Sequence, residues 1–447
     1  MKKPTPVSKE VPFEADELFF STTDLRGIIQ YGNDVFIRIS GYPSETILSA
    51  PHNIIRHPDM PKCVFKLFWD TLKQDKPIGA YVKNMAADGR YYWVFAFAFP
   101  VQNGYLSIRF KPTSKVFDRV QEIYHRVLQH EKETSMEDAD PLLMDLVRKE
   151  GFRDYEDFMV QAAILELSSR DKALKSSNQA TSNDHVVQDI SDVTAKTAAS
   201  FDQNFAKISA YQKSNEVFIN SVNMLEDEFN KLKFLSINMK ILAGNFGDEA
   251  VTLGVISEEF SKLAAKIEEQ LTTFSSFVKE LQDVIKHCSL HLAALKTQMI
   301  MVDFFVKESI NKLSTSENAF AGMLQNREVF TSLFNHSIKT LGQELSLLQN
   351  RLNAITAQIK EIQKFISGLE VIKQIGAIES ARTDEVKKSF DYYLTEMDSF
   401  TSLLSRTIST LNEQRDVLSK NTNEIYQSSE RVSGNIERLF EMALLKG

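Results

Sequence analysis

The stretch His52–Pro61, with the sequence HNIIRHPDMP, gathers side chains suited to chemistry or ligand binding. It places imidazole, guanidinium and carboxylate groups in one short loop that prolines stiffen. The guanidinium of Arg56 offers forked donors that suit a phosphate or a carbonyl group. The alternative is a surface loop in which Arg56 forms a local ion pair with Asp59. Because His52 and His57 have no carboxylate or cysteine partner at zinc spacing, no metal site is predicted.

Motifs that mark the common classes of enzyme are missing from the sequence. There is no GxGxxG after a strand, no P-loop, and no Ser/His/Asp or Cys/His arrangement with recognisable local context. The 447 residues carry a formal net charge of -8, whereas a nucleic-acid-binding surface needs a basic excess. Cys63 and Cys288 form neither a metal motif nor a disulfide framework, which fits a reducing cytoplasm. The sequence therefore predicts a cytoplasmic protein that is not an enzyme and has no nucleic-acid partner.

Long apolar segments are also missing. The most apolar stretch, Tyr91–Val101, is about half as long as a membrane-spanning helix and contains Pro100. Residues 1–13 include two lysines but no apolar segment after them, so no signal peptide is predicted. We therefore predict no transmembrane segment.

Proline usage divides the chain into two parts of different character. All 11 prolines lie at or before Pro141, and proline breaks helix interiors, so the tract after it permits long helices. Before it, short runs of strand-forming residues alternate with turn residues, and Asp88-Gly89 gives a hairpin signal. Asn33 is expected to cap a short helix over 35–40. We predict an α+β domain with a five-stranded antiparallel sheet and short helices on one face; its strands are 19–22, 28–31, 78–84, 91–100 and 105–110.

The rest of the chain has helical periodicity. Residues 115–170 are predicted to be helical, with a break at 138–141. Apolar residues recur at steps of three and four from Leu263 to Leu313, which is the near-heptad spacing of a coiled coil, and similar spacing covers 330–372 and 390–439. Helices this long pack into hairpins or bundles. We therefore predict an all-α long coiled-coil/helical-bundle region that forms an elongated homodimer.

The first part of the chain resembles the PAS domain of bacterial aerotaxis receptors over residues 19–110. The resemblance rests on STTDLRGIIQYGNDVFIRISGY, PHNIIRHPDMPKCVFKLFWDTLK, VKNMAADGRYYWV and GYLSIR. It implies a non-covalently bound FAD whose redox state is sensed, with a cofactor site at the matching positions Arg56, His57, Asp59, Asn84 and Asn33. One departure is Ile78, where the family has a tryptophan that lines its cleft, so stacking area is lost there. Haem, or no cofactor, are the alternatives.

A second resemblance concerns the helical part. The stretch 234–264, FLSINMKILAGNFGDEAVTLGVISEEFSKLA, resembles the hairpin tip of methyl-accepting chemotaxis proteins. The family's contact residues are replaced here by Leu242, Asn245 and the run 250–252. A second fragment, IGAIESARTDE at 375–385, resembles the same tip and keeps a glutamate and an arginine, although any long helical hairpin shares such patterning. The resemblance implies a chemotaxis kinase, its coupling protein or a chemoreceptor array as partner, with degenerate tip contacts.

These observations predict four segments and a sensory function. The segments are an N-terminal tail at 1–18, a PAS sensor domain at 19–114, a helical connector and linker at 115–187, and a chemoreceptor-like helical signalling domain at 188–447. The predicted function is flavin-based redox or oxygen sensing that biases a two-state helical rod. The alternative is a cofactor-free PAS dimerisation module with a scaffolding coiled coil that docks a signalling partner.

Overall fold

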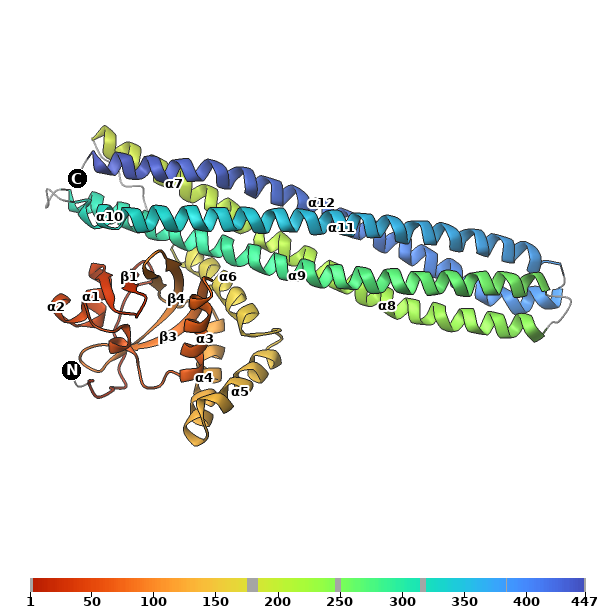
Figure 1. The fold of residues 1–447 in the computed structure, drawn as a ribbon, viewed down its shortest axis with the longest axis horizontal. Helices are drawn as coiled ribbons and strands as arrows, with labels where there is room; N and C mark the ends of the chain where they lie inside the picture. Colours follow the sequence, from red (N-terminus) through yellow and green to blue (C-terminus); the bar gives the residue numbers. More distant parts are fainter. Residues whose placement is uncertain (1–2, 175–183, 246–250, 314–318, 383, 446–447) are drawn as a thin grey trace. The chain divides into compact units, whose positions relative to one another are not determined.

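The computed structural model describes residues 3–174, 184–245, 251–313, 319–382 and 384–445. They belong to two compact units, which we describe separately. The first unit contains residues 1–205, 288–342 and 427–447, and the second contains residues 206–287 and 343–426. Figure 1 shows the strands and helices along the chain.

The N-terminal part of the first unit is built on one antiparallel sheet. Its five strands lie in the order β2-β1-β5-β4-β3. The strands are β1 Leu18–Asp24, β2 Ile29–Gly32, β3 Ile78–Met85, β4 Tyr91–Val101 and β5 Gly104–Phe110. Between β2 and β3 come the short helices α1 Asp34–Ser40, α2 Ser44–Ile47, η1 His52–Ile55 and α3 Lys62–Lys73. The predicted fold class, a five-stranded antiparallel sheet with short helices followed by long helices, is confirmed.

Asn33 fastens β1 to α1 through its side-chain amide. Its Oδ1 accepts hydrogen bonds from the backbone N–H groups of Phe36 and Phe20, at 3.1 and 3.0 Å. Its Nδ2 donates to the carbonyl oxygen of Leu18 at 2.8 Å. The predicted helix cap is confirmed, and the same side chain also holds the neighbouring strand.

Three helices follow the sheet, namely α4 Val116–Glu133, α5 Met136–Lys149 and α6 Tyr155–Ala173. The predicted break at 138–141 is wrong, because α5 runs through these residues. The interruption lies at 134–135, where the Ser135 side chain caps α5 by accepting from the N–H of Asp138 at 3.1 Å. Pro141 falls in the second turn of α5, close enough to its start that little of the helix precedes it.

A buried carboxylate joins α6 to the sheet and to the segment that leaves it. Glu166 on α6 is 0% exposed, and its Oε1 accepts from the Tyr81 hydroxyl at 2.8 Å and the Ser114 hydroxyl at 2.7 Å. Its Oε2 accepts from the backbone N–H groups of Thr113 and Ser114 at 2.7 and 3.0 Å. Burial followed by the Glu166 charge raises the pKa of Tyr81. The first residues after β5 are thus held by a side chain from a helix that lies some fifty residues further along the chain.

A buried lysine connects three helices of the first unit. Lys296 on α9 Val251–Lys312 is only 3% exposed along its side chain. Its ammonium pairs with Asp171 on α6 and, at 2.8 Å, with Asp202 on α7 His185–Ala206. It also lies 4.7 Å from the centre of the Phe205 ring. The charge is therefore fully paired despite its burial.

Four long helices, α8 Ile208–Asn245, α9, α11 Arg327–Ser380 and α12 Asp384–Leu444, make up most of the rest of the chain. The short helix α10 Ala321–Gln325 lies between α9 and α11 in the sequence. The stripe residues from Ile267 to Val306 lie on the single helix α9 and are buried. One of the tip positions discussed above, at 250, lies outside the described residues.

Among the described helices, α9 is long and apolar enough to cross a membrane by length and composition alone. The mean hydropathy of its most apolar window is 1.2, and 78% of that window is buried inside the structure. Because a buried core helix passes the same test, this is weak evidence for a membrane span.

Candidate functional site

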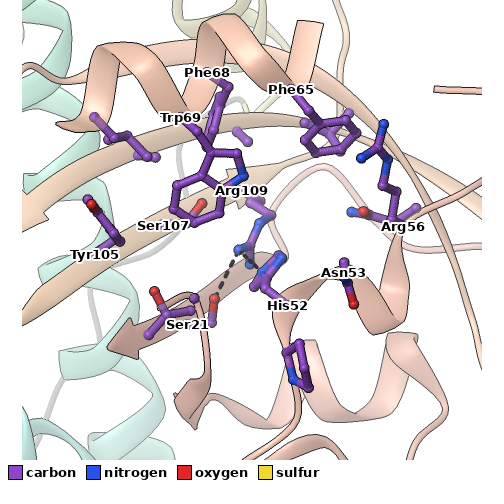
Figure 2. A pocket seen from close by; sticks show the side chains of 18 of the residues that line it. Ser21, His52, Asn53, Arg56, Phe65, Phe68, Trp69, Tyr105, Ser107 and Arg109 are labelled. Atoms are coloured by element: carbon purple, nitrogen blue, oxygen red, sulfur yellow. Dashed lines mark hydrogen bonds between the residues drawn. The ribbon is translucent and has the colours of Figure 1, made fainter. Parts of the chain in front are cut away.

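A cavity of about 240 Å³ lies between the sheet and the helices η1 and α3. Figure 2 shows the side chains that point into it. They come from every strand except β2 and from both helices; among them are Ser21, Thr23, His52, Asn53, Arg56, Phe65, Phe68, Trp69, Val82, Asn84, Ala96, Ala98, Tyr105, Ser107 and Arg109. Small alanines on β4 leave this space open, while larger side chains from α3 and β5 wall it.

The helix α3 supplies an aromatic wall. Phe65, Phe68, Trp69 and Leu72 lie at helical spacing, so they share the face of α3 that lines the cavity. The Trp69 ring meets the Tyr105 ring edge to face, with centroids 5.3 Å apart. Trp69 thus gives the cavity a large aromatic surface even though position 78 is an isoleucine.

Arg109 is the charged group at the centre of the site. It is 3% exposed, and burial lowers the pKa of its guanidinium to about 10. One terminal nitrogen donates to the Ser21 hydroxyl at 2.9 Å and to Nε2 of His52 at 2.7 Å, while the other has no hydrogen-bond partner among the residues that the structure describes. Burial and the neighbouring Arg109 lower the pKa of His52 to about 3, so its imidazole is neutral and accepts this hydrogen bond. A buried guanidinium without a carboxylate partner within the described chain is unusual, because buried charges are normally paired.

Other polar atoms in the cavity wall also have no hydrogen-bond partner in the described part of the chain. These atoms are Asn84 Nδ2, Ser107 Oγ and Thr23 Oγ1. Buried polar groups are usually hydrogen-bonded, so several unsatisfied atoms around one space indicate a ligand that would satisfy them. Together with Arg109 they offer mainly donors, which suits a ligand rich in acceptor atoms.

The structure brings two of the sequence-predicted residues, Arg56 and Asn84, to this cavity. Arg56 is half-buried at one end of it, with its guanidinium carbon 3.9 Å from the centre of the Phe65 ring. Burial lowers the pKa of Arg56. Asn84 is 2% exposed and forms an isolated backbone bridge with Arg56. Asn33 lies away from the cavity lining, where its amide is occupied by the three backbone hydrogen bonds described above.

His57 and Asp59 line a separate pocket instead, and His57 also lines a larger cavity, of about 730 Å³, that adjoins the first at Arg56. The backbone N–H of Asp59 donates to Nδ1 of His57 at 3.1 Å, and the Asp59 carboxylate pairs with Lys83 at 2.9 Å. The local Arg56–Asp59 ion pair considered from the sequence is therefore not formed; Lys83 takes that place. Burial lowers the pKa of His57 to about 4.

A second cavity, of about 730 Å³, adjoins the first at Arg56. Arg56 and Asn53 line both spaces. The basic residues Lys3, Lys62 and Lys132 also line the second one, beside the single carboxylate of Glu131. Burial and the charge of Arg56 lower the pKa of Lys3. This crowding of positive charge favours an anion.

Sequence reasoning did not single out Trp69, Ser107 or Arg109, although patterns for them exist. The helical spacing of the α3 aromatics would have placed Trp69 on a lining face. In GYLSIRF, the residues Tyr105, Ser107 and Arg109 alternate with apolar residues, which puts the three on one face of β5. Within the described residues, no group of three or more histidine, cysteine, aspartate or glutamate side chains could hold a metal ion.

Comparisons with known proteins concern this same part of the chain. A family described as the PAS fold matches residues 29–107. The aerotaxis receptor of Escherichia coli (strain K12) is 39% identical over 126 residues, which are 27% of this chain and 25% of that protein. The nitrogen fixation regulatory protein of Klebsiella pneumoniae is 31% identical over 90 residues, which are 20% of this chain and 18% of that protein. The matches thus span about a quarter or less of either relative.

Solved structures give matches over the same share of the chain. A PAS domain of a Colwellia psychrerythraea protein has 19% identity and a TM-score of 0.20, covering 21% of this chain and 85% of that one. The light state of the blue-light photoreceptor Aureochrome1 LOV has 19% identity and a TM-score of 0.21, covering 23% and 86%. The sheet, its helices and the family match over residues 29–107 lead to one conclusion: the N-terminal part of this chain is a PAS domain related to that of an aerotaxis receptor, and it is followed by long helices.

Proposed function

We propose that this chain is a cytoplasmic signal-transduction sensor whose PAS domain binds FAD and responds to redox state or oxygen. The observation that carries the proposal is Arg109, a buried guanidinium with an unused nitrogen at the wall of the 240 Å³ cavity. The relative named an aerotaxis receptor supports the same function class. A bound flavin would supply a ring system whose charge and hydrogen bonding change when electrons are gained or lost.

The residues of the cavity fit a flavin ring. Trp69 and Phe65 offer aromatic surface for a flat heterocycle. The free donors of Arg109 and Asn84 suit the carbonyl oxygens and ring nitrogens of such a ligand. Because the hydrogen-bond partners of Arg109 within the described chain, Ser21 and His52, are neutral, its charge remains available to the ligand.

The two adjoining cavities suit a dinucleotide better than a lone ring. Small-molecule sites usually occupy about 300–1,000 Å³, so the first cavity has room for a ring but not for a whole dinucleotide. The ligand would pass Arg56 and place its phosphates in the second cavity, beside Lys3, Lys62 and Lys132. Guanidinium and ammonium groups are the side chains that best bind phosphate oxygens.

The strand β5 offers a route from the cavity to the helices. Ser107 and Arg109 lie on β5, and the chain reaches Thr113 and Ser114 a few residues later. Glu166 holds both of these residues from α6. A ligand that binds Arg109 and shifts β5 would therefore alter the hydrogen bonds from Thr113 and Ser114 to the Glu166 carboxylate. A local change in polar contacts of this kind can bias a two-state element.

The test is the absorption spectrum of the purified full chain, before and after dithionite, with chromatography of the released cofactor. We expect a yellow protein that bleaches on reduction and releases FAD. Arg109→Gln and Arg56→Ala should lower occupancy about tenfold or more, because each removes charge-assisted hydrogen bonds of about 1.5–3 kcal/mol. Arg90→Gln is the matched control, since Arg90 pairs with Asp88 on the β3–β4 turn, outside the cavity. A folded, colourless protein that takes up no added FAD would favour the scaffolding alternative.

Titration of the apoprotein with FAD and with riboflavin tests the second cavity. FAD should bind more tightly than riboflavin, and Lys3→Ala with Lys132→Ala should remove most of the difference. If the two ligands bind equally well to the unaltered protein, flavin binding stands but the phosphate site does not.

The remaining parts of the proposal concern partners and chemistry. We propose that the chain catalyses no reaction and acts through a helical signalling partner, either a chemotaxis kinase with its coupling protein or a chemoreceptor array. Leu242 and Asn245 lie at the C-terminal end of α8, while an ion pair between Glu379 and Arg382, at 2.9 Å, lies at the end of α11. Reconstitution with a chemotaxis kinase and its coupling protein tests whether either of these helix ends contacts the kinase.

A further inference from the structure

Within the second unit, four long helices contact one another in a ring. Helix α8 lies against α9, where Lys233 and Glu268 form an ion pair at 2.9 Å. Helix α9 lies against α11, where the Gln358 amide donates to Oε1 of Gln270 at 2.6 Å. The second contact places α9 and α11 side by side, although they belong to different helical hairpins, α8 with α9 and α11 with α12.

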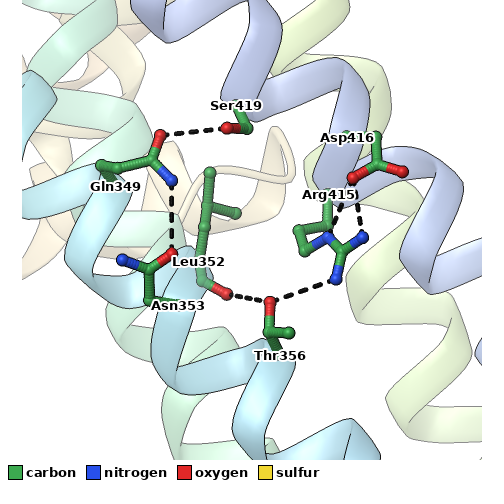
Figure 3. A network of polar contacts seen from close by, with 7 residues as sticks. All are labelled: Gln349, Leu352, Asn353, Thr356, Arg415, Asp416 and Ser419. Atoms are coloured by element: carbon green, nitrogen blue, oxygen red, sulfur yellow. Dashed lines mark hydrogen bonds and ion pairs between the residues drawn. The ribbon is translucent and has the colours of Figure 1, made fainter.

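The other two sides of the ring are also closed. Helix α11 meets α12, where the Ser419 hydroxyl donates to Gln349 at 3.1 Å and Arg415 donates to Thr356 at 3.3 Å (Figure 3). Helix α12 returns to α8, where the Tyr211 and Thr422 hydroxyls are 2.9 Å apart. Each helix therefore has two neighbours from the same chain.

Apolar side chains from all four helices fill the interior of the ring. Phe218, Phe274, Leu348 and Leu418 are each 0% exposed, and they come from α8, α9, α11 and α12 respectively. Residues of this size are fully buried only when neighbours cover them on all sides. The bundle therefore has a complete core without a second chain.

The ring has the arrangement that two copies of one hairpin would produce. Helices α8 and α9 form the first hairpin, and α11 and α12 form the second. The first helix of each hairpin contacts the second helix of the other, as α8 does with α12 and α11 does with α9. Exchanging the two hairpins leaves this contact pattern unchanged, as it would in a bundle built from two copies of one hairpin. Two fragments, 234–264 and 375–385, resemble one and the same tip. Their described residues lie at the end of α8 and the start of α9, and at the end of α11 and the start of α12.

We propose that the helical part is a fused pair of hairpins, in which α11 and α12 occupy the face of α8 and α9 that a second copy would otherwise cover. One chain then makes one complete signalling bundle. The homodimer expected from the sequence is not needed for this core, and any self-association would use another surface. Among the described residues, the Glu379–Arg382 pair lies at the end of the second hairpin, so a partner that reads this pair meets it once per bundle.

Cysteine cross-linking in the full chain distinguishes the two arrangements. The variant Ser214→Cys with Gln414→Cys joins α8 to α12, because these side chains are 2.9 Å apart. The variant Gln349→Cys with Ser419→Cys joins the two helices of the second hairpin and is the control, since it must cross-link within one chain in either arrangement. A short bis-maleimide reagent is added to dilute protein, and the products are separated on a denaturing gel. Single-cysteine variants control for Cys63 and Cys288, which are both buried.

We expect both double variants to give cross-linked monomers. Cross-linked dimers from Ser214→Cys with Gln414→Cys, alongside monomers from the control, would overturn the proposal, because α12 would then come from another copy. Absence of any product from that variant, when the control reacts, would also overturn it, since α8 and α12 would not be neighbours. This outcome is independent of whether the PAS domain binds flavin.

Discussion

Removing the carboxylate of Glu166 should weaken the attachment of α6 to the segment that follows β5 and lower the free energy of unfolding. In Glu166→Ala, the backbone N–H groups of Thr113 and Ser114 lose their acceptor, while the hydroxyls of Tyr81 and Ser114 can rotate toward others. Each buried donor left unsatisfied costs about 1–3 kcal/mol, so the two backbone groups give a loss of about 2–6 kcal/mol in the free energy of unfolding. In Glu166→Gln, the amide oxygen can keep both backbone hydrogen bonds and the NH₂ group can donate to the hydroxyls. Only the charge assistance is lost, which amounts to about 1–2 kcal/mol.

Urea unfolding of the full chain, followed by tryptophan fluorescence, measures this loss where it occurs. The chain has two tryptophans, Trp69 and Trp93, and both belong to the PAS domain, so their signal reports on that part. Lys172→Gln is the control on the same helix, because Lys172 is exposed, and it should change stability by no more than about 0.5 kcal/mol. If Glu166→Ala is no more destabilising than Glu166→Gln, the buried carboxylate does not hold the segment after β5 and the proposed route to the helices fails.

Three further predictions concern pH, thiol reactivity and the partner. The pKa of His52 is about 3 in the folded protein and 6.5 for the free group. Between these pH values the unfolded chain binds one more proton at this position than the folded protein does. The free energy of unfolding therefore falls as the pH drops through this range. Between pH 6.5 and 5, His52 and His57, whose pKa is lowered to about 4, should each contribute a loss on the order of 2 kcal/mol. The loss should fall by about half in His52→Gln but persist in full in the exposed control His125→Gln. Burial raises the pKa of Cys63 to about 12, so its thiol should react with iodoacetamide far more slowly than a free thiol at pH 8, and rapid labelling of the folded protein would contradict its placement. In reconstitution with a chemotaxis kinase and its coupling protein, we expect little activation of autophosphorylation; strong activation that is lost in Glu379→Ala or Arg382→Ala would assign the signalling tip to the second hairpin.

Much of the fold could be predicted because its signals are local. Strands with turn residues between them, such as the Asp88-Gly89 hairpin, depend on neighbours in the sequence. The apolar stripe of α9 repeats over many turns, so it marks one long helix reliably. The break predicted near Pro141 was wrong. The Ser135 cap fixes the start of α5, and Pro141 then falls in the second turn, where a proline disturbs little of the helix.

The candidate site was harder to predict because its contacts join distant residues. The partners of Arg109, namely Ser21 and His52, are 88 and 57 positions away, and nothing in their local sequence announces the contact. Glu166 lies on a helix that is buried almost all round, so the periodicity of α6 does not mark it. Motif resemblance found Arg56 and Asn84, but it could not show that Asn33 is occupied with backbone hydrogen bonds.

The two carboxylates around Lys296 limit which combinations of substitutions at positions 171, 202 and 296 the fold can tolerate. Asp171 and Asp202 are both partly exposed and each pairs with the same buried ammonium, so one can compensate for the loss of the other. Losing both would leave a buried charge without a partner, which typically costs 3–5 kcal/mol. Either aspartate can therefore change alone, whereas the second change must follow or accompany replacement of Lys296. Among relatives that share these helices, at least one of positions 171 and 202 should stay acidic wherever position 296 is basic, and both should become neutral only where position 296 is neutral.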